Sequence, residues 1–236
     1  MILAFTGRLG SGKTLGMTYW GWRLSYAAGG LPILANYPIR EEYFAAHRRR
    51  NGAFRFYNLR SEEDWLQFAA GGGGVVLLDE LHRLVDARTA LSAQNVVLTQ
   101  FMAFLRKIGA TTLVTDQHAA FMDVRLRVLV DGWVQCQSSR APGGDITGFR
   151  WDSYDAGGRR RRTLALPASE VRPIMGAYDT RQIIRGFQFP RNLAAFDTFL
   201  DKLDQAVQEY QERAGQALPP APSESDLQAM LAGAQA

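Results

Sequence analysis

Apolar and polar positions follow one another along this chain in blocks that predict strands and helices in turn. Residues 2–5 form a short apolar run that predicts a strand, and a glycine-rich loop follows it. Across residues 15–28 large apolar side chains recur at helical spacing, and two glycines then end the pattern where a helix usually ends. Residues 31–39 predict a second strand. The chain therefore opens with a strand, a loop, a helix and a strand, which indicates an α/β domain.

The middle of the chain repeats this alternation. Residues 54–58 alternate as a strand does, and Ser61 begins a capped helix. Residues 75–78 form the continuous apolar run that a parallel strand covered on both faces requires, and residues 110–115 predict another buried strand that leads to a polar tip. Residues 96–105 predict the helix between them. We expect a central, mostly parallel sheet flanked by helices on both faces, with added antiparallel strands from about residue 133 onward.

The last third divides into three parts. The α/β domain is expected to cover residues 1–190 and to include a β-hairpin at 149–166. Residues 191–215 predict an amphipathic helix, and we favour packing on the core over contact with a neighbouring subunit. Residues 216–236 begin with a proline-rich linker and predict a flexible tail. The apolar positions of the helix are Leu193, Phe196, Leu200, Leu203, Val207 and Tyr210.

Composition narrows the class of protein. Apolar residues make up 47% of the chain, yet no stretch approaches the roughly 20 apolar residues of a membrane span. A single cysteine, Cys136, excludes a disulfide framework, and three scattered histidines lack metal-ligand spacing. With no signal peptide before the first strand, we expect a reducing compartment. The formal charge is +4, and the acidic segment 200–236 leaves the rest of the chain more basic still.

The glycine-rich loop after the first strand has the pattern G-x-x-x-x-G-K-T over residues 7–14. Its glycines allow backbone N–H groups to point inward around phosphate oxygens, and the following helix adds its positive dipole end. Lys13 can reach the β- and γ-phosphates of ATP, and Thr14 offers a hydroxyl to Mg²⁺. The expected ATP-binding residues are Gly7, Leu9, Gly10, Ser11, Gly12, Lys13, Thr14 and Leu15.

Two acids follow the apolar strand at 75–78. At the carboxyl end of a parallel strand, Asp79 would lie beside the phosphate loop and hold Mg²⁺. Glu80 would then polarise the attacking water as a general base. Gln117 ends the next buried strand, where it could orient that water and sense the γ-phosphate. By itself a glutamine at a strand end is weak evidence.

Several motifs resemble, in their order along the chain, those of the FtsK/HerA superfamily of DNA-pumping ATPases. The small size is similar to that of the genome-packaging ATPases of tailless icosahedral viruses with an internal membrane. The chain is also similar to the Zot family, which includes the assembly ATPase of filamentous phages. One departure is Asp116, where the superfamily more often has a small or hydroxyl residue. The motifs are residues 7–14, Leu77-Leu78-Asp79-Glu80, Arg106-x-x-Gly109, Thr115-x-Gln117 and the segment 117–131.

The resemblance implies a P-loop NTPase fold of the RecA/FtsK–HerA type and a homo-oligomeric ring, which we expect to be a hexamer. It also implies that Arg106 acts in trans on the γ-phosphate of the neighbouring subunit, where a guanidinium neutralises charge that develops in phosphoryl transfer. The alternative is a solvated arginine at a helix end. Arg125 and Arg127 are other candidates for this finger, and Arg83 and Arg88 are weaker ones.

The predicted hairpin carries four consecutive arginines in its second arm, with aromatic residues in the first. Arg159, Arg160, Arg161 and Arg162 could hold DNA phosphates without reading sequence. A solvated edge strand protected by charge explains them equally well.

The function expected from these features is ATP hydrolysis that moves double-stranded DNA into a viral capsid. Expected cofactors and partners are ATP, Mg²⁺, double-stranded DNA, further copies of the chain, and a capsid or inner-membrane vertex protein. The expected location is the packaging vertex of the virion or the host cytoplasm. Two alternatives stay open: a Zot-like ATPase for filamentous phage extrusion, and a nucleotide-switched assembly factor that does not pump.

Overall fold

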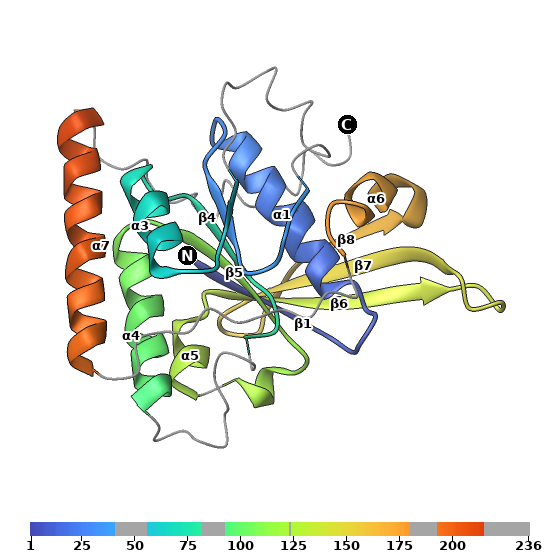
Figure 1. Ribbon diagram of the computed structural model, residues 1–236. Coiled ribbons are helices and arrows are strands. Elements are labelled where there is room, and N and C mark those ends of the chain that lie inside the picture. Colours follow the sequence, from blue (N-terminus) through green and yellow to red (C-terminus); the bar gives the residue numbers. More distant parts are fainter. Residues whose placement is uncertain (41–55, 82–92, 123, 180–192, 215–236) are drawn as a thin grey trace.

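The computed structural model describes residues 1–40, 56–81, 93–122, 124–179 and 193–214 (Figure 1). The strands are β1 (Ile2–Thr6), β2 (Ile33–Ala35), β3 (Phe56–Asn58), β4 (Val75–Leu78), β5 (Thr111–Asp116), β6 (Gly132–Arg140), β7 (Ile146–Asp155) and β8 (Arg160–Pro167). They form one sheet in the order β3-β2-β4-β5-β1-β6-β7-β8. The first six are parallel, and β7 is antiparallel to both of its neighbours. This confirms the predicted α/β fold with added antiparallel strands.

Helices cover both faces of the sheet. They are α1 (Lys13–Ala27), α3 (Glu62–Ala70), α4 (Ala93–Lys107), α5 (Val124–Leu129), α6 (Ala168–Met175) and α7 (Leu193–Ala214), with a short 3-10 turn at Ala119–Phe121. Helices α1 and α6 lie on one face, and α3, α4, α5 and α7 lie on the other (Figure 1). Within the described ranges, no helix is both long and apolar enough to cross a membrane.

Side chains of the central strands alternate between two apolar cores. In β1, Ile2 and Ala4 enter the core under α3, α4 and α7, whereas Leu3 and Phe5 enter the core under α1. The ring of Phe5 meets that of Trp20 edge to face, with centroids 5.8 Å apart. Because both faces are buried, β1 and β4 require apolar residues at consecutive positions, which explains their apolar runs. Strand β5 is buried as well, with Leu113 and Val114 between buried threonines.

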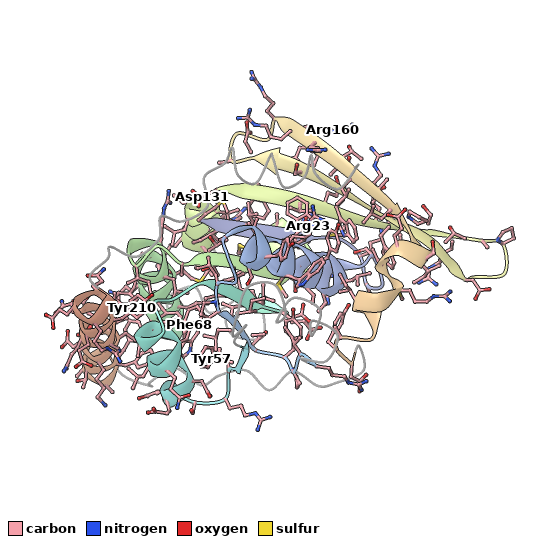
Figure 2. The ribbon with its side chains drawn as sticks, turned by 90° about the horizontal axis from the view of Figure 1, so that it is seen from above. Arg23, Tyr57, Phe68, Asp131, Arg160 and Tyr210 are labelled. Carbon is pink, nitrogen blue, oxygen red and sulfur yellow. The ribbon has the colours of Figure 1, made fainter. Side chains whose placement is uncertain are left out.

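Helix α7 packs against the outside of α3 and α4. Phe196 and Phe199 are completely buried there, and Phe199 lies against Phe101 of α4 with ring centroids 6.1 Å apart. Near the other end of the helix, Tyr210 covers Gly72, where a Cβ would come within 2.5 Å of the tyrosine ring (Figure 2). The linker and tail predicted for residues 216–236 lie outside the described residues.

Strand β2 is shorter than the predicted strand at 31–39. Pro32 precedes the strand and contributes only its carbonyl, which accepts a hydrogen bond from the Val75 N–H. After Ala35 the Asn36 N–H still donates to the Leu77 carbonyl at 3.1 Å, and the Asn36 side chain pairs with the backbone of Asp79. The early end of β2 thus places an amide at the end of β4.

Strands β6 and β7 continue beyond the parallel part of the sheet. Thr6, the last residue of β1, lies opposite Gln135, yet β6 runs on to Arg140 and pairs with β7 along its length. The hairpin therefore projects past the end of β1 (Figure 1). A second turn, with Gly158 at φ 80°, leads from β7 into the edge strand β8.

Candidate nucleotide-binding site

The loop between β1 and α1 depends on glycine for both its backbone shape and its close packing. Gly7, Gly10 and Gly12 have φ angles of 148°, 74° and 82°, which L residues rarely adopt. A Cβ on Gly7 would lie 2.5 Å from the Cys136 carbonyl oxygen, and one on Gly12 would lie 2.5 Å from the Phe149 ring. The loop therefore packs closely against the β6–β7 hairpin, with Gly12 directly before the first turn of α1.

Polar donors of the loop face the same space. The Lys13 ammonium donates to the carbonyl oxygens of Gly7 and Arg8, at 3.0 and 3.1 Å, so it lies across the loop. The Ser11 hydroxyl is buried and has no hydrogen-bond partner in the part of the chain that the structure describes. An ammonium, a buried hydroxyl and a helix N-terminus together fit a phosphate group.

Two of the predicted ATP-binding residues could take part only through their backbones. Leu9 is at the tip of the loop with its side chain 88% exposed. Leu15 is buried in the core beneath α1. Their side chains are accordingly not part of the polar cradle.

Thr14 and Asp79 meet directly at the base of the loop. The Thr14 Oγ1 lies 3.0 Å from each carboxylate oxygen of Asp79, which is 7% exposed at the end of β4. A hydroxyl beside a carboxylate fits Mg²⁺, which takes a few protein oxygens and completes its octahedron with substrate oxygens and water. The described residues contain no group of three or more acidic, histidine or cysteine side chains that would bind a metal alone.

Neighbouring strands fix the position of Asp79. Asn36, directly after β2, donates from Nδ2 to the Asp79 carbonyl at 3.0 Å and accepts from the Asp79 N–H at 2.8 Å. Thr115 of β5 donates its hydroxyl to the Asp79 carboxylate. Sequence reasoning did not assign either residue to the site. The available signal was that each is polar and stands at the carboxyl end of a strand, next to the strand that carries the acids.

Burial raises the pKa of the Asp79 carboxyl above its ordinary value. Hydrogen bonds from Thr115 and Thr14 oppose that shift, and the nearby charge of Glu80 adds to it. Without a cation the site therefore favours a proton on Asp79 more than water would. A bound divalent cation would reverse that preference.

Glu80 has a strained backbone. Its φ of 52° makes it the one non-glycine residue in the described part of the chain with positive φ. Such a conformation costs about 1–3 kcal/mol and often occurs where function demands a particular side-chain direction. Its N–H donates to the Thr115 hydroxyl at 2.8 Å, which fixes the turn. Glu80 is thus held at the carboxyl end of β4, next to Asp79.

Gln117 lies beside the loop. Its backbone carbonyl accepts a hydrogen bond from the Gly7 N–H at 3.3 Å, and its side chain is exposed. The neighbouring Asp116 is buried and accepts from the Gln117 N–H at 2.7 Å. Gln117 therefore follows a strand that separates the loop-bearing β1 from the acid-bearing β4.

The β6–β7 hairpin supports the loop from the other side, and sequence reasoning missed this. Trp151 Nε1 donates to the Gly12 carbonyl at 3.3 Å, and the Ser138 hydroxyl donates to the Gly10 carbonyl at 3.1 Å. Phe149 stacks on Trp151 with centroids 5.9 Å apart. A Cβ on Gly16 would come within 2.5 Å of Trp151 Nε1, so this helical glycine was the available signal.

Solved structures similar to this chain include both kinds of protein that its motifs resemble. One is the genome packaging NTPase B204 from Sulfolobus turreted icosahedral virus 2 in complex with ATP-gammaS, at 13% identity and a TM-score of 0.45. That similarity covers 70% of this chain and 95% of the other. Another is the N-terminal domain of zonular occludens toxin from Neisseria meningitidis, at 19% identity and a TM-score of 0.44, covering 75% of this chain and 98% of the other. No family model matches the sequence, and no curated protein matches it.

Arg106 lies at the opposite end of the parallel strands from the loop of its own subunit. Its Nη2 lies 3.0 Å from Asp131 Oδ1, and Asp131 Oδ2 accepts from the Ile2 N–H at 2.7 Å. Ile2 begins β1, whereas the loop follows the end of that strand. Figure 2 places Asp131 at the end of β6 away from the projecting hairpin.

The other candidates for the arginine finger are on or near α5. Arg125 and Arg127 both belong to this short helix, where Arg127 is exposed and Arg125 partly so. Arg83 and Arg88 lie outside the described residues. Of the three candidates in the described residues, Arg106 has an ion pair with Asp131. Which of them acts as the finger stays a prediction.

The arginine run at the start of β8 is largely paired with acids of β7. Arg160 lies 3.3 Å from Asp152, and Arg161 lies 3.0 Å from Asp155. Arg159 is in the turn, and the Arg162 carbonyl accepts a hydrogen bond from Ser153 at 3.2 Å. Two of the four arginines are thus paired with acids of β7, and phosphate binding by the run stays a prediction.

Proposed function

We propose that this chain is a Mg²⁺-dependent ATPase that moves double-stranded DNA as part of a homo-oligomeric ring. The observation that supports it most is the contact between Thr14 and Asp79, 3.0 Å from hydroxyl to carboxylate. It joins the phosphate loop of β1 to the acids of β4 across the intervening strand β5. A glycine-rich turn without function would not need a buried carboxylate at this position.

Residues of the loop bind and orient the substrate. Backbone N–H groups of the loop and Lys13 would hold the β- and γ-phosphates, with Lys13 exchanging its two carbonyl partners for phosphate oxygens. Thr14 and Asp79 would hold Mg²⁺, which neutralises phosphate charge when bound. Asn36 and Thr115 keep Asp79 in place.

Glu80 accepts a proton from the attacking water. The water oxygen bonds to the γ-phosphorus, the bond from that phosphorus to the β–γ bridging oxygen breaks, and the products are ADP and inorganic phosphate. Gln117 orients the water and senses the γ-phosphate. Arg106 of the adjacent subunit contributes positive charge, which makes hydrolysis depend on assembly.

Genome packaging is the process we assign to this motor. The resemblance of the ordered motifs to DNA-pumping ATPases supports it, as does the excess of basic residues outside the acidic segment 200–236. Its partners would be double-stranded DNA, further copies of the chain, and a capsid or inner-membrane vertex protein. Its location would be the packaging vertex or the host cytoplasm.

Steady-state ATPase activity tests this function, measured over a range of protein concentrations with and without double-stranded DNA. A DNA-moving ring predicts turnover per subunit that rises with concentration and rises further with DNA. ATP binding with turnover that stays flat in both titrations would contradict the pump. The chain would then act as a nucleotide-switched assembly factor, or as an extrusion ATPase that requires a membrane partner.

A further inference from the structure

The face of β6, β7 and β8 that is turned away from α1 and α6 is polar and open. This face is polar because side chains alternate along β7: Phe149 and Trp151 enter the core under α1, and Arg150 and Asp152 point to the other side. We call this surface the outer face of β6–β8. It consists of Gln135 and Gln137 of β6, Arg150, Asp152 and Tyr154 of β7, and Arg160 and Thr163 of β8.

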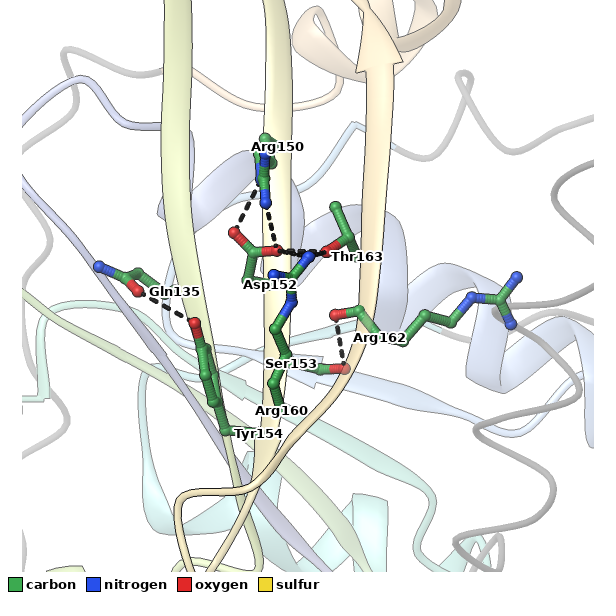
Figure 3. A network of polar contacts seen from close by, with 8 residues as sticks. All are labelled: Gln135, Arg150, Asp152, Ser153, Tyr154, Arg160, Arg162 and Thr163. Atoms are coloured by element: carbon green, nitrogen blue, oxygen red, sulfur yellow. Dashed lines mark hydrogen bonds and ion pairs between the residues drawn. The ribbon is translucent and has the colours of Figure 1, made fainter.

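Asp152 fixes two arginines at the centre of this face (Figure 3). It is 3% exposed, and Arg150 donates to its two carboxylate oxygens at 2.8 and 3.1 Å. Arg160 lies 3.3 Å from the same carboxylate and also bonds Thr163, whose hydroxyl donates to Asp152. The hydrogen bond from Arg150 lowers the pKa of Asp152 below its ordinary value. Both guanidiniums are thereby ordered, while their side chains remain 45% and 54% exposed.

The charge and polarity of these strands favour an anionic partner. Residues 132–167 contain six arginines, three aspartates, and neither lysine nor glutamate, which gives a formal charge of +3. Among the described residues, the large apolar side chains that are well exposed are Leu9, Val124, Val128 and Met175, all outside these strands. A protein partner bound through an apolar patch would therefore find little to contact here.

We propose that the outer face of β6–β8 binds the sugar–phosphate backbone of double-stranded DNA, with Arg150 and Arg160 as the main contacts. Each guanidinium keeps N–H donors beyond those used by Asp152, and phosphate groups match that geometry. Binding single strands usually requires exposed aromatic rings for base stacking, whereas Tyr154 is only partly exposed and its hydroxyl lies against Gln135 at 3.5 Å. This proposal deepens the proposed function and rests on it for its choice of partner.

The same strand connects this face to the nucleotide site. Trp151, between Arg150 and Asp152 in sequence, donates to the Gly12 carbonyl, and Phe149 packs against Gly12. On the other face of β7, Asp152 holds Arg150 of the same strand and Arg160 of β8. The proposed DNA site and the phosphate loop therefore lie on opposite faces of β7.

DNA affinity as a function of salt tests the proposal, measured by fluorescence anisotropy with a labelled duplex of arbitrary sequence and no nucleotide. Each phosphate contact contributes about 0.9 to the slope of log K against log salt, which corresponds to roughly eightfold in affinity between 1 M and 0.1 M salt. Arg150→Ala and Arg160→Ala should each lower the slope by about 1, and the double variant by about 2. The control Arg172→Ala removes an exposed charge from α6, on the opposite face, and should leave slope and affinity unchanged.

Several outcomes would overturn the proposal. An unchanged slope in the double variant, with thermal stability lowered, would mean that the arginines only hold β8 to β7. Equal losses in Arg172→Ala would mean that binding follows net charge, and a change in sedimentation without DNA would make this face a contact between copies of the chain. Arg150→Lys covers the case in which the alanine variant does not fold, because it keeps the charge and should keep the slope. Hydrolysis by the wild type without DNA is measured separately, so failure of the ATPase and failure of this surface are distinguishable.

Discussion

Asp79 and Glu80 are each in an energetically unfavourable environment or conformation. Asp79 is a buried carboxylate whose pKa is raised by that burial, and Glu80 next to it has positive φ. Each feature lowers the free energy of unfolding, and packing alone does not offset that loss. A buried carboxylate and a strained neighbouring residue at the end of one strand, beside the glycine-rich loop, are features typical of a catalytic centre.

The raised pKa of Asp79 predicts how stability depends on pH. Between the ordinary value of 3.8 and the raised pKa, the folded chain binds more protons than the unfolded chain, so the free energy of unfolding falls as pH rises through that interval. Asp79→Asn removes this group and should be the more stable protein above the interval, with the advantage shrinking toward pH 4. Chemical denaturation at several pH values, without metal or nucleotide, measures it. An advantage that grew as pH fell would contradict the assignment.

Individual site residues could be predicted from the sequence only where they belong to a motif with fixed spacing. The loop pattern and the acid pair predicted Lys13, Thr14 and Asp79, because spacing along one segment is enough to place them. Asn36 and Thr115 could not be placed in the same way. Their contacts with Asp79 depend on β2 and β5 being the neighbours of β4, and strand order is not written in any one segment.

The most consequential element beyond the loop is the β6–β7 hairpin. It packs under Gly12 through Phe149 and donates a hydrogen bond to it from Trp151. The sequence predicted added antiparallel strands from about residue 133 and a hairpin at 149–166, which corresponds to β7 and β8, and it predicted the parallel core from continuous apolar runs. It could not show that the hairpin lies against the loop, because that contact joins residues 139 positions apart.

Trp151→Phe tests the contact between the hairpin and the loop. The substitution removes the hydrogen bond to Gly12 but keeps an aromatic ring between Phe149 and Tyr19, with which Trp151 stacks at 6.0 Å. We expect a loss of about 1 kcal/mol in the free energy of unfolding, and ATP binding weaker by a factor of about 2–10. Calorimetric titration measures the affinity. Trp133→Phe, which alters the other core, is the control, and an equal effect of both variants would contradict a specific contact.

At the scale of the whole molecule, the parts of the proposed site lie at the two opposite ends of the parallel strands. The loop, Asp79 and Glu80 are at the carboxyl ends of the parallel strands, and Arg106 is at the other end with Asp131. A finger acting on its own loop would have to cross the domain, which is why we propose a ring in which each Arg106 faces the loop of the neighbouring subunit.

Mixing two inactive variants tests this arrangement. Arg106→Ala lacks the finger and Glu80→Gln lacks the base, so each alone should lose hydrolysis, the first by roughly 10³-fold or more. In an equal mixture, about one quarter of the interfaces join an intact Glu80 to an intact Arg106, and activity should return to that extent. Phosphate release from the mixture measures it. A mixture no more active than its components would place the finger elsewhere, and Arg125→Ala and Arg127→Ala would replace Arg106→Ala in the same assay.

The most direct test of the central claim is phosphate release from Mg·ATP by the wild type and by Glu80→Gln, with ATP binding measured on the same samples. The substitution keeps the size of the side chain and removes its ability to accept a proton. We predict that Glu80→Gln binds ATP as the wild type does and releases phosphate about 10²-fold more slowly or worse. Undiminished phosphate release by Glu80→Gln would contradict hydrolysis at this site.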